Sequence, residues 1–265
     1  MNVLDLFSGI GGFSLGLERA GMRTVAFCEI EPYCRAVLRK HWPDVRCYEN
    51  ITHLGPAEVE SLGTIDVVCG GFPCQPFSLA GKRRGDTDDR HLWPKMRSVI
   101  TYAQPSWVIG ENVAGLISMG LDQVLFDLEA IGYTSRTFVV PACAVDAPHR
   151  RERVWIVAHS ESDGRRKGIS QPDAWSDQAC GERERQPRRA CPDVSDTRCE
   201  LLEGWSGESE ARSTQWISEP DVGRVAHGVP ARVDRLRSLG NAVVPQIPEL
   251  MGNAILRHLR VAEAA

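Results

Sequence analysis

The feature that most constrains this chain is the regular alternation of short apolar runs with amphipathic helical patterns before residue 160. Strands are predicted at residues 2–7, 24–30, 65–69, 107–110, 134–140 and 153–158. Helices are predicted between them at residues 12–20, 32–41, 92–103 and 121–131. Strands that alternate with helices form a largely parallel sheet with helices on both faces, so the pattern predicts an α/β fold. We expect the functional site at the carboxyl ends of the strands.

Composition sets the class of protein. The chain has 265 residues, of which 42% are hydrophobic and 25% are charged, and this balance is typical of a globular protein with a buried core. The sequence contains no apolar run of membrane-spanning length and no secretory signal at its start. The nine cysteines have neither a disulfide framework nor zinc-ligand spacing. We therefore expect a cytoplasmic protein with reduced thiols and without a metal.

The character of the chain changes after residue 159. Residues 160–228 are polar and poor in aliphatic runs, which is typical of a small loop-rich domain or a partly ordered insertion. A helical pattern returns near the end, where Pro245 opens an apolar stripe. We therefore expect residues 1–159 and 229–265 to form one domain around the inserted segment 160–228.

Charge limits how such a chain would hold a nucleic acid. The formal net charge is −4, whereas nucleic-acid-binding proteins are usually basic. Any affinity of this kind would come from local basic groups, and a solvated surface is the alternative for each of them. These groups lie at residues 82–84, at residues 150, 151 and 153, and at residues 232, 235 and 237.

A glycine-rich segment at residues 5–13 follows the first predicted strand and opens a helix. Glycines there let a ligand approach the backbone, and the start of a helix offers free N–H groups. Glu29 ends the next strand, where an acid commonly binds ribose hydroxyls. The pattern predicts a nucleotide-like cofactor, and a plain tight turn is the alternative.

Asp66 stands within an apolar run, where a carboxylate is costly unless it is paired. At the carboxyl end of a strand it would accept a hydrogen bond from an adenine amino group. A capping or structural role is the alternative.

Cys74 lies between Pro73 and Pro76, in a loop just past a predicted strand. The prolines stiffen this loop, and an exposed thiol at the ligand edge of the sheet indicates a nucleophile. A small buried hydrophobic residue is the alternative. Glu111 follows the strand at residues 107–110 and is expected at the same edge, although a carboxylate there can also cap a loop.

These motifs together resemble the C5-cytosine DNA methyltransferase family. The similar segments follow the order of the family's motifs and lie at residues 5–13, 71–78, 111–113, 148–153 and 239–245. The resemblance implies a Rossmann-like class I fold that binds S-adenosylmethionine, with the last helix returning beside the first motif. It implies that residues 160–228 form the target-recognition region. His149 departs from the family's usual glutamine.

The resemblance also implies a chemistry, the transfer of a methyl group from S-adenosylmethionine to C5 of a cytosine flipped out of double-stranded DNA. It implies that Cys74 adds to C6, that Glu111 acts at N3, and that Arg151 and Arg153 supply positive charge nearby. The cofactor-binding residues that it implies are Phe7, Ser8, Gly9, Ile10, Gly11, Gly12, Glu29, Ile30, Asp66, Val67, Pro73, Asn241 and Ala242. The DNA-binding residues that it implies are Ser78, Lys82, Arg83, Arg84 and Arg90.

Two alternatives share this resemblance. One is an RNA methyltransferase that acts on cytosine C5 of tRNA, and the other is a catalytically inactive DNA-binding homologue. For the main interpretation we expect a monomer in a bacterium or a phage-infected bacterium. A cognate restriction endonuclease that acts on the same site, without forming a stable complex, is its expected partner enzyme.

Overall fold

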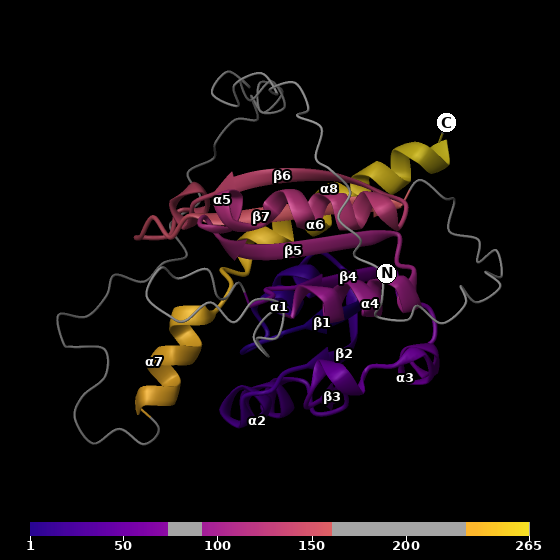
Figure 1. Cartoon of the computed structure of the whole chain (residues 1–265). Helices are drawn as coiled ribbons and strands as arrows, with labels where there is room; N and C mark the ends of the chain where they lie inside the picture. The colour runs from indigo at the N-terminus through magenta and orange to yellow at the C-terminus, as the bar shows by residue number, and fades with distance from the viewer. Residues whose placement is uncertain (74–91, 161–231, 265) are drawn as a thin grey trace, which may run out of the picture. The chain divides into compact units, whose positions relative to one another are not determined.

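The computed structural model describes residues 1–73, 92–160 and 232–264, and these belong to one compact unit. Its centre is a sheet of seven strands in the order β3-β2-β1-β4-β5-β7-β6 (Figure 1). The strands are β1 (Asn2–Leu6), β2 (Arg23–Cys28), β3 (Arg46–Tyr48), β4 (Val67–Gly70), β5 (Trp107–Val113), β6 (Tyr133–Val140) and β7 (Arg153–Ser160). Strands β1 to β5 are parallel, and β7 is antiparallel to β5 and β6. The predicted α/β class with a mostly parallel sheet is confirmed.

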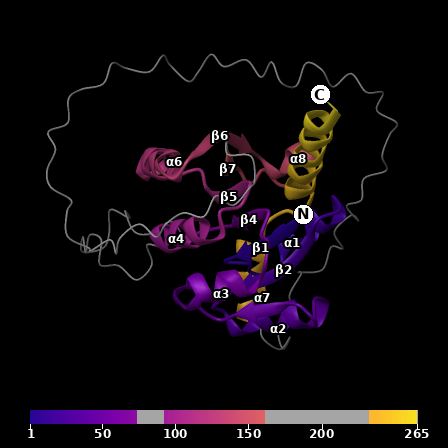
Figure 2. The ribbon, with the colours of Figure 1, turned by 90° about the vertical axis from the view of Figure 1, so that its right-hand side faces the viewer.

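Helices cover both faces of this sheet. They are α1 (Gly12–Arg19), α2 (Pro32–His41), α3 (Pro56–Ser61), α4 (Trp93–Ala103), α5 (Leu116–Met119), α6 (Leu121–Ala130), α7 (Arg232–Asn241) and α8 (Gln246–Ala264), with short 3-10 helices η1 (Ile51–His53) and η2 (Ala142–Val145). Figure 2 shows α4 and α6 on one side of the sheet and α1 and α8 on the other. Each side has its own apolar core: Met96 and Leu128 belong to the first, and Leu17 and Ile255 to the second. None of the helices in the described part of the chain is long and apolar enough to cross a membrane.

The last helix returns to the first, as the resemblance implies. Gly12 and Gly16 on α1 make room for this return, because side chains there would collide with the backbone of the segment that enters α8. A Cβ on Gly12 would lie 2.6 Å from the carbonyl oxygen of Val243, and one on Gly16 would meet that of Pro245. The segment that connects α7 to α8 therefore lies directly against the glycine-rich turn.

The predicted strands and helices before residue 160 are all present, with ends shifted by a few residues. Strand β5 is longer than predicted because Glu111, Asn112 and Val113 pair with β7. The sequence patterns did not predict β3, α3, α5, α7 or the two 3-10 helices. Apart from Ser160, which ends β7, the predicted target-recognition segment 160–228 lies outside the described residues.

Candidate active site

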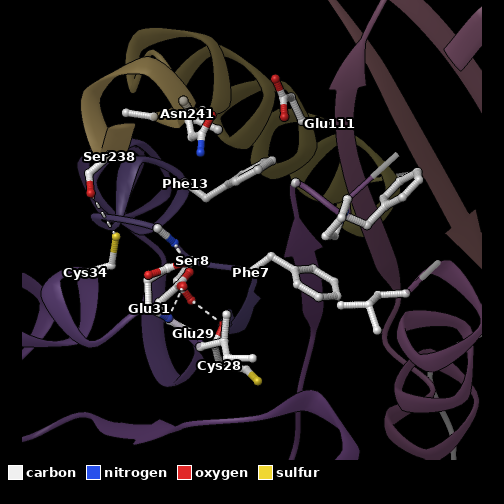
Figure 3. A pocket seen from close by; sticks show the side chains of 18 of the residues that line it. Phe7, Ser8, Phe13, Cys28, Glu29, Glu31, Cys34, Glu111, Ser238 and Asn241 are labelled. Atoms are coloured by element: carbon white, nitrogen blue, oxygen red, sulfur yellow. Dashed lines mark hydrogen bonds between the residues drawn. The ribbon is translucent and has the colours of Figure 1, made fainter. Parts of the chain in front are cut away.

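A cavity of about 500 Å³ opens at the carboxyl edge of the parallel strands. Its walls come from the turns after β1 and β2, the segments after β3 and β4, the end of β5, the start of β7 and the junction of α7 with α8. Figure 3 shows Phe7, Glu29, Glu111 and Asn241 around the same space. The predicted site residues that line it are Phe7, Ser8, Gly9, Glu29, Ile30, Pro73, Glu111, Arg151, Arg153, Asn241 and Ala242.

The turn after β1 is held by the end of β2. Phe7 and Gly9 both adopt positive φ, which glycine accepts readily and phenylalanine does not. The Ser8 hydroxyl donates to the carbonyl oxygen of Asp5 at 2.6 Å, and the Gly9 N–H donates to Oε2 of Glu29 at 2.7 Å. The glycine turn and the end of β2 therefore form one preorganised corner of the cavity.

Glu29 is only 7% exposed, and both of its oxygens accept backbone hydrogen bonds. Besides the bond from Gly9, Oε1 accepts the N–H of Glu31 at 2.8 Å. The carboxylate is therefore fixed in orientation at the cavity wall, and its remaining lone pairs can accept from a hydroxyl-bearing ligand.

Arg35 on α2 joins the two turns that follow β2 and β3. One guanidinium nitrogen donates to the carbonyl oxygen of Ile30 at 2.5 Å, and another lies 3.1 Å from Oε1 of Glu49. Ile30 and Glu49 both line the cavity. Arg35 thus supports two neighbouring wall segments from behind.

Asp5 lies beneath the glycine turn and has no exposed surface. Its Oδ2 accepts the hydroxyl of Ser14 at 2.7 Å, whereas buried Oδ1 has no hydrogen-bond partner among the residues that the structure describes. Burial raises the pKa of Asp5 to about 7, and the nearby charge of Glu29 adds to this while Ser14 opposes it. This carboxyl group therefore titrates near neutral pH.

Glu111 and Arg153 form an ion pair on the opposite side of the cavity. Nε of Arg153 lies 2.9 Å from Oε1 of Glu111, whose residue is 9% exposed. Burial raises the pKa of Glu111, and the charges of Arg153 and Arg151 oppose that shift. The carboxyl group can hold or share a proton with a ring nitrogen in the cavity.

Phe72, the residue before Pro73, is held in place by a chain of three contacts. Nδ2 of Asn112 donates to the carbonyl oxygen of Phe72 at 2.9 Å, and the Phe72 ring packs on Trp93 with centroids 5.0 Å apart. Nε1 of Trp93 donates in turn to buried Asp127 at 2.7 Å. The chain therefore enters the predicted nucleophile loop from a defined position. The predicted residues Cys74, Ser78, Lys82, Arg83, Arg84 and Arg90 themselves lie outside the described residues.

The structure corrects the position predicted for Asp66. The strand begins only at Val67, so Asp66 lies at the amino end of β4, and its carboxylate accepts the N–H of Asn2 at 2.6 Å. Val67 is fully buried in the apolar core against Val3. Both predictions placed these residues at the ligand edge, and neither residue lines the cavity. The apolar run at residues 65–69 did not show that the strand begins only at Val67.

Other predicted residues have different surroundings from those expected. Ile10, Gly11 and Gly12 belong to the glycine turn but do not line the cavity, and Gly12 faces Val243 instead. Arg237, predicted as part of a basic surface group, forms an ion pair with Glu31 at 3.1 Å.

The structure adds wall residues that the sequence patterns missed. They come from the first turn of α2, the segment after β3, and α7, and are Glu31, Tyr33, Cys34, Glu49, Asn50, Ile51, Asp234, Arg237 and Ser238. Strand β3 has three residues, too few for a periodic signal. The apolar spacing of Val233, Leu236 and Leu239 was the available signal for α7.

Comparisons with known proteins agree with this architecture. A family model described as C-5 cytosine-specific DNA methylase matches residues 1–219. The Type II methyltransferase M2.BsuMI of Bacillus subtilis (strain 168) is 35% identical over 167 residues, which are 60% of this chain and 42% of that protein. M.HgiCII of Herpetosiphon aurantiacus is 35% identical over 61% of this chain and 38% of its own length. The match thus spans about two fifths of these relatives.

Solved structures share the fold. A putative DNA modification methyltransferase encoded within prophage Cp of E. coli has a TM-score of 0.53 and 26% identity, over 61% of this chain and 47% of its own. A DNMT2 mutant of Spodoptera frugiperda has a TM-score of 0.53 and 22% identity, over 67% of this chain and 53% of its own. This second likeness shows a common fold.

Proposed function

Because the chain belongs to the C-5 cytosine-specific DNA methylase family, we propose that it methylates C5 of cytosine in double-stranded DNA with S-adenosylmethionine. One observation carries the proposal: a fixed carboxylate suited to a ribose, Glu29, and a buried carboxyl paired with arginine, Glu111, line one cavity. A nucleoside ligand and a second heteroaromatic ring can thus be held side by side.

The cavity residues fit S-adenosylmethionine. Glu29 accepts hydrogen bonds, so it suits the paired hydroxyls of a ribose. Phe7 and Ile30 offer apolar surface to a purine. Asn241 lies on the side of Glu111 (Figure 3), and Ala242 also lines the cavity. When bound, this cofactor supplies an electrophilic methyl group on a sulfonium. We leave Asp66 out of the cofactor site because it lies at the amino edge of the sheet.

The protein's own residues prepare the base. We propose that the Cys74 thiolate adds to C6 of the flipped cytosine, while the Glu111 carboxyl shares a proton with N3. Electron density drawn toward N3 makes C6 electrophilic, and the resulting enamine makes C5 nucleophilic. After methyl transfer, which leaves S-adenosylhomocysteine as the product, we propose that water accepts the C5 proton, the Cys74 thiolate leaves C6, and the aromatic ring is restored. Arg153 orients Glu111 through the 2.9 Å ion pair.

The target base must leave the duplex, because stacking shields C5 and C6. We propose that Ser78, Lys82, Arg83, Arg84 and Arg90 contact the DNA around it and that residues 160–228 read the target sequence. The relatives are named Type II methyltransferases, and we extend a restriction–modification role to this chain. We further propose that the protein is a cytoplasmic monomer and that a separate endonuclease acts on the same DNA site.

The test is methyl transfer by the full chain. Duplex DNA and total tRNA are incubated separately with radiolabelled S-adenosylmethionine, and bisulfite sequencing then locates the modified cytosines. We expect labelled DNA, no label with Cys74→Ala, and a rate lowered by two or more orders of magnitude with Glu111→Gln. Cofactor affinity should persist in both variants.

Other results would favour the alternatives. Strong labelling of tRNA with none on DNA would identify an RNA methyltransferase. Binding of cofactor and DNA without any transfer would identify an inactive homologue. Turnover retained by Cys74→Ala would refute the proposed nucleophile.

A further inference from the structure

Arg151 and Arg153 come from one motif, yet their guanidinium groups have different partners. Arg153 contacts Glu111, whereas Arg151 donates to two backbone carbonyls near the far end of the chain. The distances are 2.6 Å to the oxygen of Gly240 and 2.8 Å to that of Ala242. A planar guanidinium suits such paired acceptors because its N–H groups point in fixed directions.

The backbone of Arg151 is also specialised. Its φ is +33°, a region that L-residues with side chains rarely adopt and that is strained for them. Such a conformation persists where surrounding contacts stabilise it, and the two carbonyl bonds supply contacts of this kind. The geometry therefore directs this side chain to the last residues of α7 and the first residues of the connection to α8.

That segment, residues 240–243, is a wall of the cavity. Asn241, Ala242 and Val243 line it, and Val243 also lies against Gly12 of the glycine turn. We call residues 240–243 the closing segment. Holding its carbonyls in place also holds Asn241 at the cavity.

The other side of the closing segment is tied through α7 to α2. Arg237 pairs with Glu31 at 3.1 Å, and the Ser238 hydroxyl lies 3.3 Å from the thiol of Cys34. Arg151 provides the attachment on the β7 side. Removing it frees the closing segment on that side while the α2 contacts remain.

We propose that Arg151 is a positioning residue that fastens the closing segment to β7 and thereby sets cofactor affinity, rather than acting on the target base. The inference rests on the proposed function, since it takes S-adenosylmethionine as the ligand of the cavity. The two arginines of the motif then have different roles. Arg153 orients the Glu111 carboxyl that faces the base, and Arg151 positions the cavity wall that contacts the cofactor.

The test compares Arg151→Ala and Arg151→Gln with a neighbour, Arg150→Ala, in the full chain. The Arg150 side chain is 85% exposed, and its ion pair with Glu152 at 3.2 Å lies at the surface, so it is a matched control. Calorimetry with S-adenosylhomocysteine should show about tenfold weaker binding for both Arg151 variants and no change for Arg150→Ala. Arg151→Lys should recover part of the affinity because an ammonium still donates to carbonyls.

Steady-state kinetics separate an effect on cofactor binding from an effect on the chemical step. We expect KM for S-adenosylmethionine to rise about tenfold in Arg151→Ala while kcat at saturating cofactor changes by less than about threefold. A fall in kcat with unchanged KM and unchanged S-adenosylhomocysteine affinity would overturn the inference, because Arg151 would then act on the chemical step.

Hydrogen exchange of the ligand-free protein makes the inference testable even if the proposed function fails. The amides of residues 240–243 should exchange faster in Arg151→Gln than in wild type or Arg150→Ala. Equal exchange rates would overturn the fastening role. Wild-type protein that binds no S-adenosylhomocysteine would refute the proposed function alone, and the exchange result would still decide the role of Arg151. Arg151→Gln keeps a polar side chain but is shorter than arginine and lacks the paired guanidinium donors, so the comparison stands if Arg151→Ala does not fold.

Discussion

Asp5, a single residue beneath the site, makes the stability of the folded protein depend on pH. Its pKa of about 7 in the folded protein lies above the ordinary value of 3.8 because the carboxyl is fully buried. Between these values the folded protein keeps a proton that the unfolded chain has lost. The stability that Asp5 contributes is therefore complete below about pH 4 and is lost as the pH rises through about 7.

Urea unfolding at pH 5 and pH 8 measures this effect. As the pH rises from 5 to 8, we expect ionisation of the Asp5 carboxyl in the folded protein to lower the free energy of unfolding by roughly 3 kcal/mol. Asp5→Asn has no carboxyl to ionise and should show a smaller decline. An equal decline in both proteins would contradict the assignment to Asp5.

Arg35 is expected to matter for ligand affinity although it does not line the cavity. Its guanidinium joins Ile30 and Glu49, so Arg35→Ala should loosen both wall segments and weaken S-adenosylhomocysteine binding several-fold. Arg39→Ala, one turn along α2 on an exposed position, is the matched control. Calorimetry of both variants checks this, and equal affinities would show that Arg35 has no supporting role.

At the scale of elements, Asp127 fastens α6 to α4. Its carboxylate accepts Nε1 of Trp93 at 2.7 Å, Arg97 at 2.9 Å and Gln123 at 2.9 Å. Asp127→Ala leaves the buried indole N–H without a partner, so we expect a loss of roughly 2 to 3 kcal/mol in the free energy of unfolding.

Glu129→Ala, an exposed change near the end of the same helix, should stay within about 0.5 kcal/mol of wild type. Chemical denaturation of the two variants provides the comparison. Similar stabilities would mean that the Asp127 contacts contribute little.

The elements that the sequence predicted are those with long periodic patterns. α2 begins and ends as predicted, since Pro32 fixes its start and the apolar period runs its full length. β3 was missed because it is short and stabilised by pairing with β2. Asp66 was misplaced because the adenine role assumed the carboxyl end of a strand, whereas Asp66 precedes β4.

The site was predictable in part for a related reason. Glu29 follows β2 directly, and Glu111 follows the apolar run at residues 107–110 near the end of β5, so topology alone brings them to one edge. The contact between Cys34 and Ser238 joins residues 204 positions apart, and no local pattern encodes it. The partners of Arg151 lie 89 and 91 positions away, so no local pattern distinguishes its surroundings from those of Arg153.

At the scale of the whole molecule, the net charge is −4, so under the proposed function we expect DNA affinity to come from local basic groups. Arg237, Arg153 and Arg151 each contact other parts of the protein, so we take residues 82–84 as the principal candidates. Replacing Lys82, Arg83 and Arg84 together by alanine should weaken DNA binding and reduce the slope of log affinity against log salt by roughly 3.

Arg23→Ala at the amino end of β2 is the control and should leave that slope unchanged. Fluorescence anisotropy with a labelled duplex at several salt concentrations gives the slopes. An unaltered slope in the triple variant would place the phosphate contacts elsewhere.

The cavity draws its walls from both ends of the sequence, Phe7 and Gly9 on one side and Asn241 and Ala242 on the other. A ribosome synthesises the first pair more than two hundred residues before the second pair. During that interval the nascent chain carries Glu29 and Glu111 but an open, incomplete pocket. Under the proposed function, a message truncated before residue 240 yields no partly active enzyme, and methylation of the genome begins only from finished molecules.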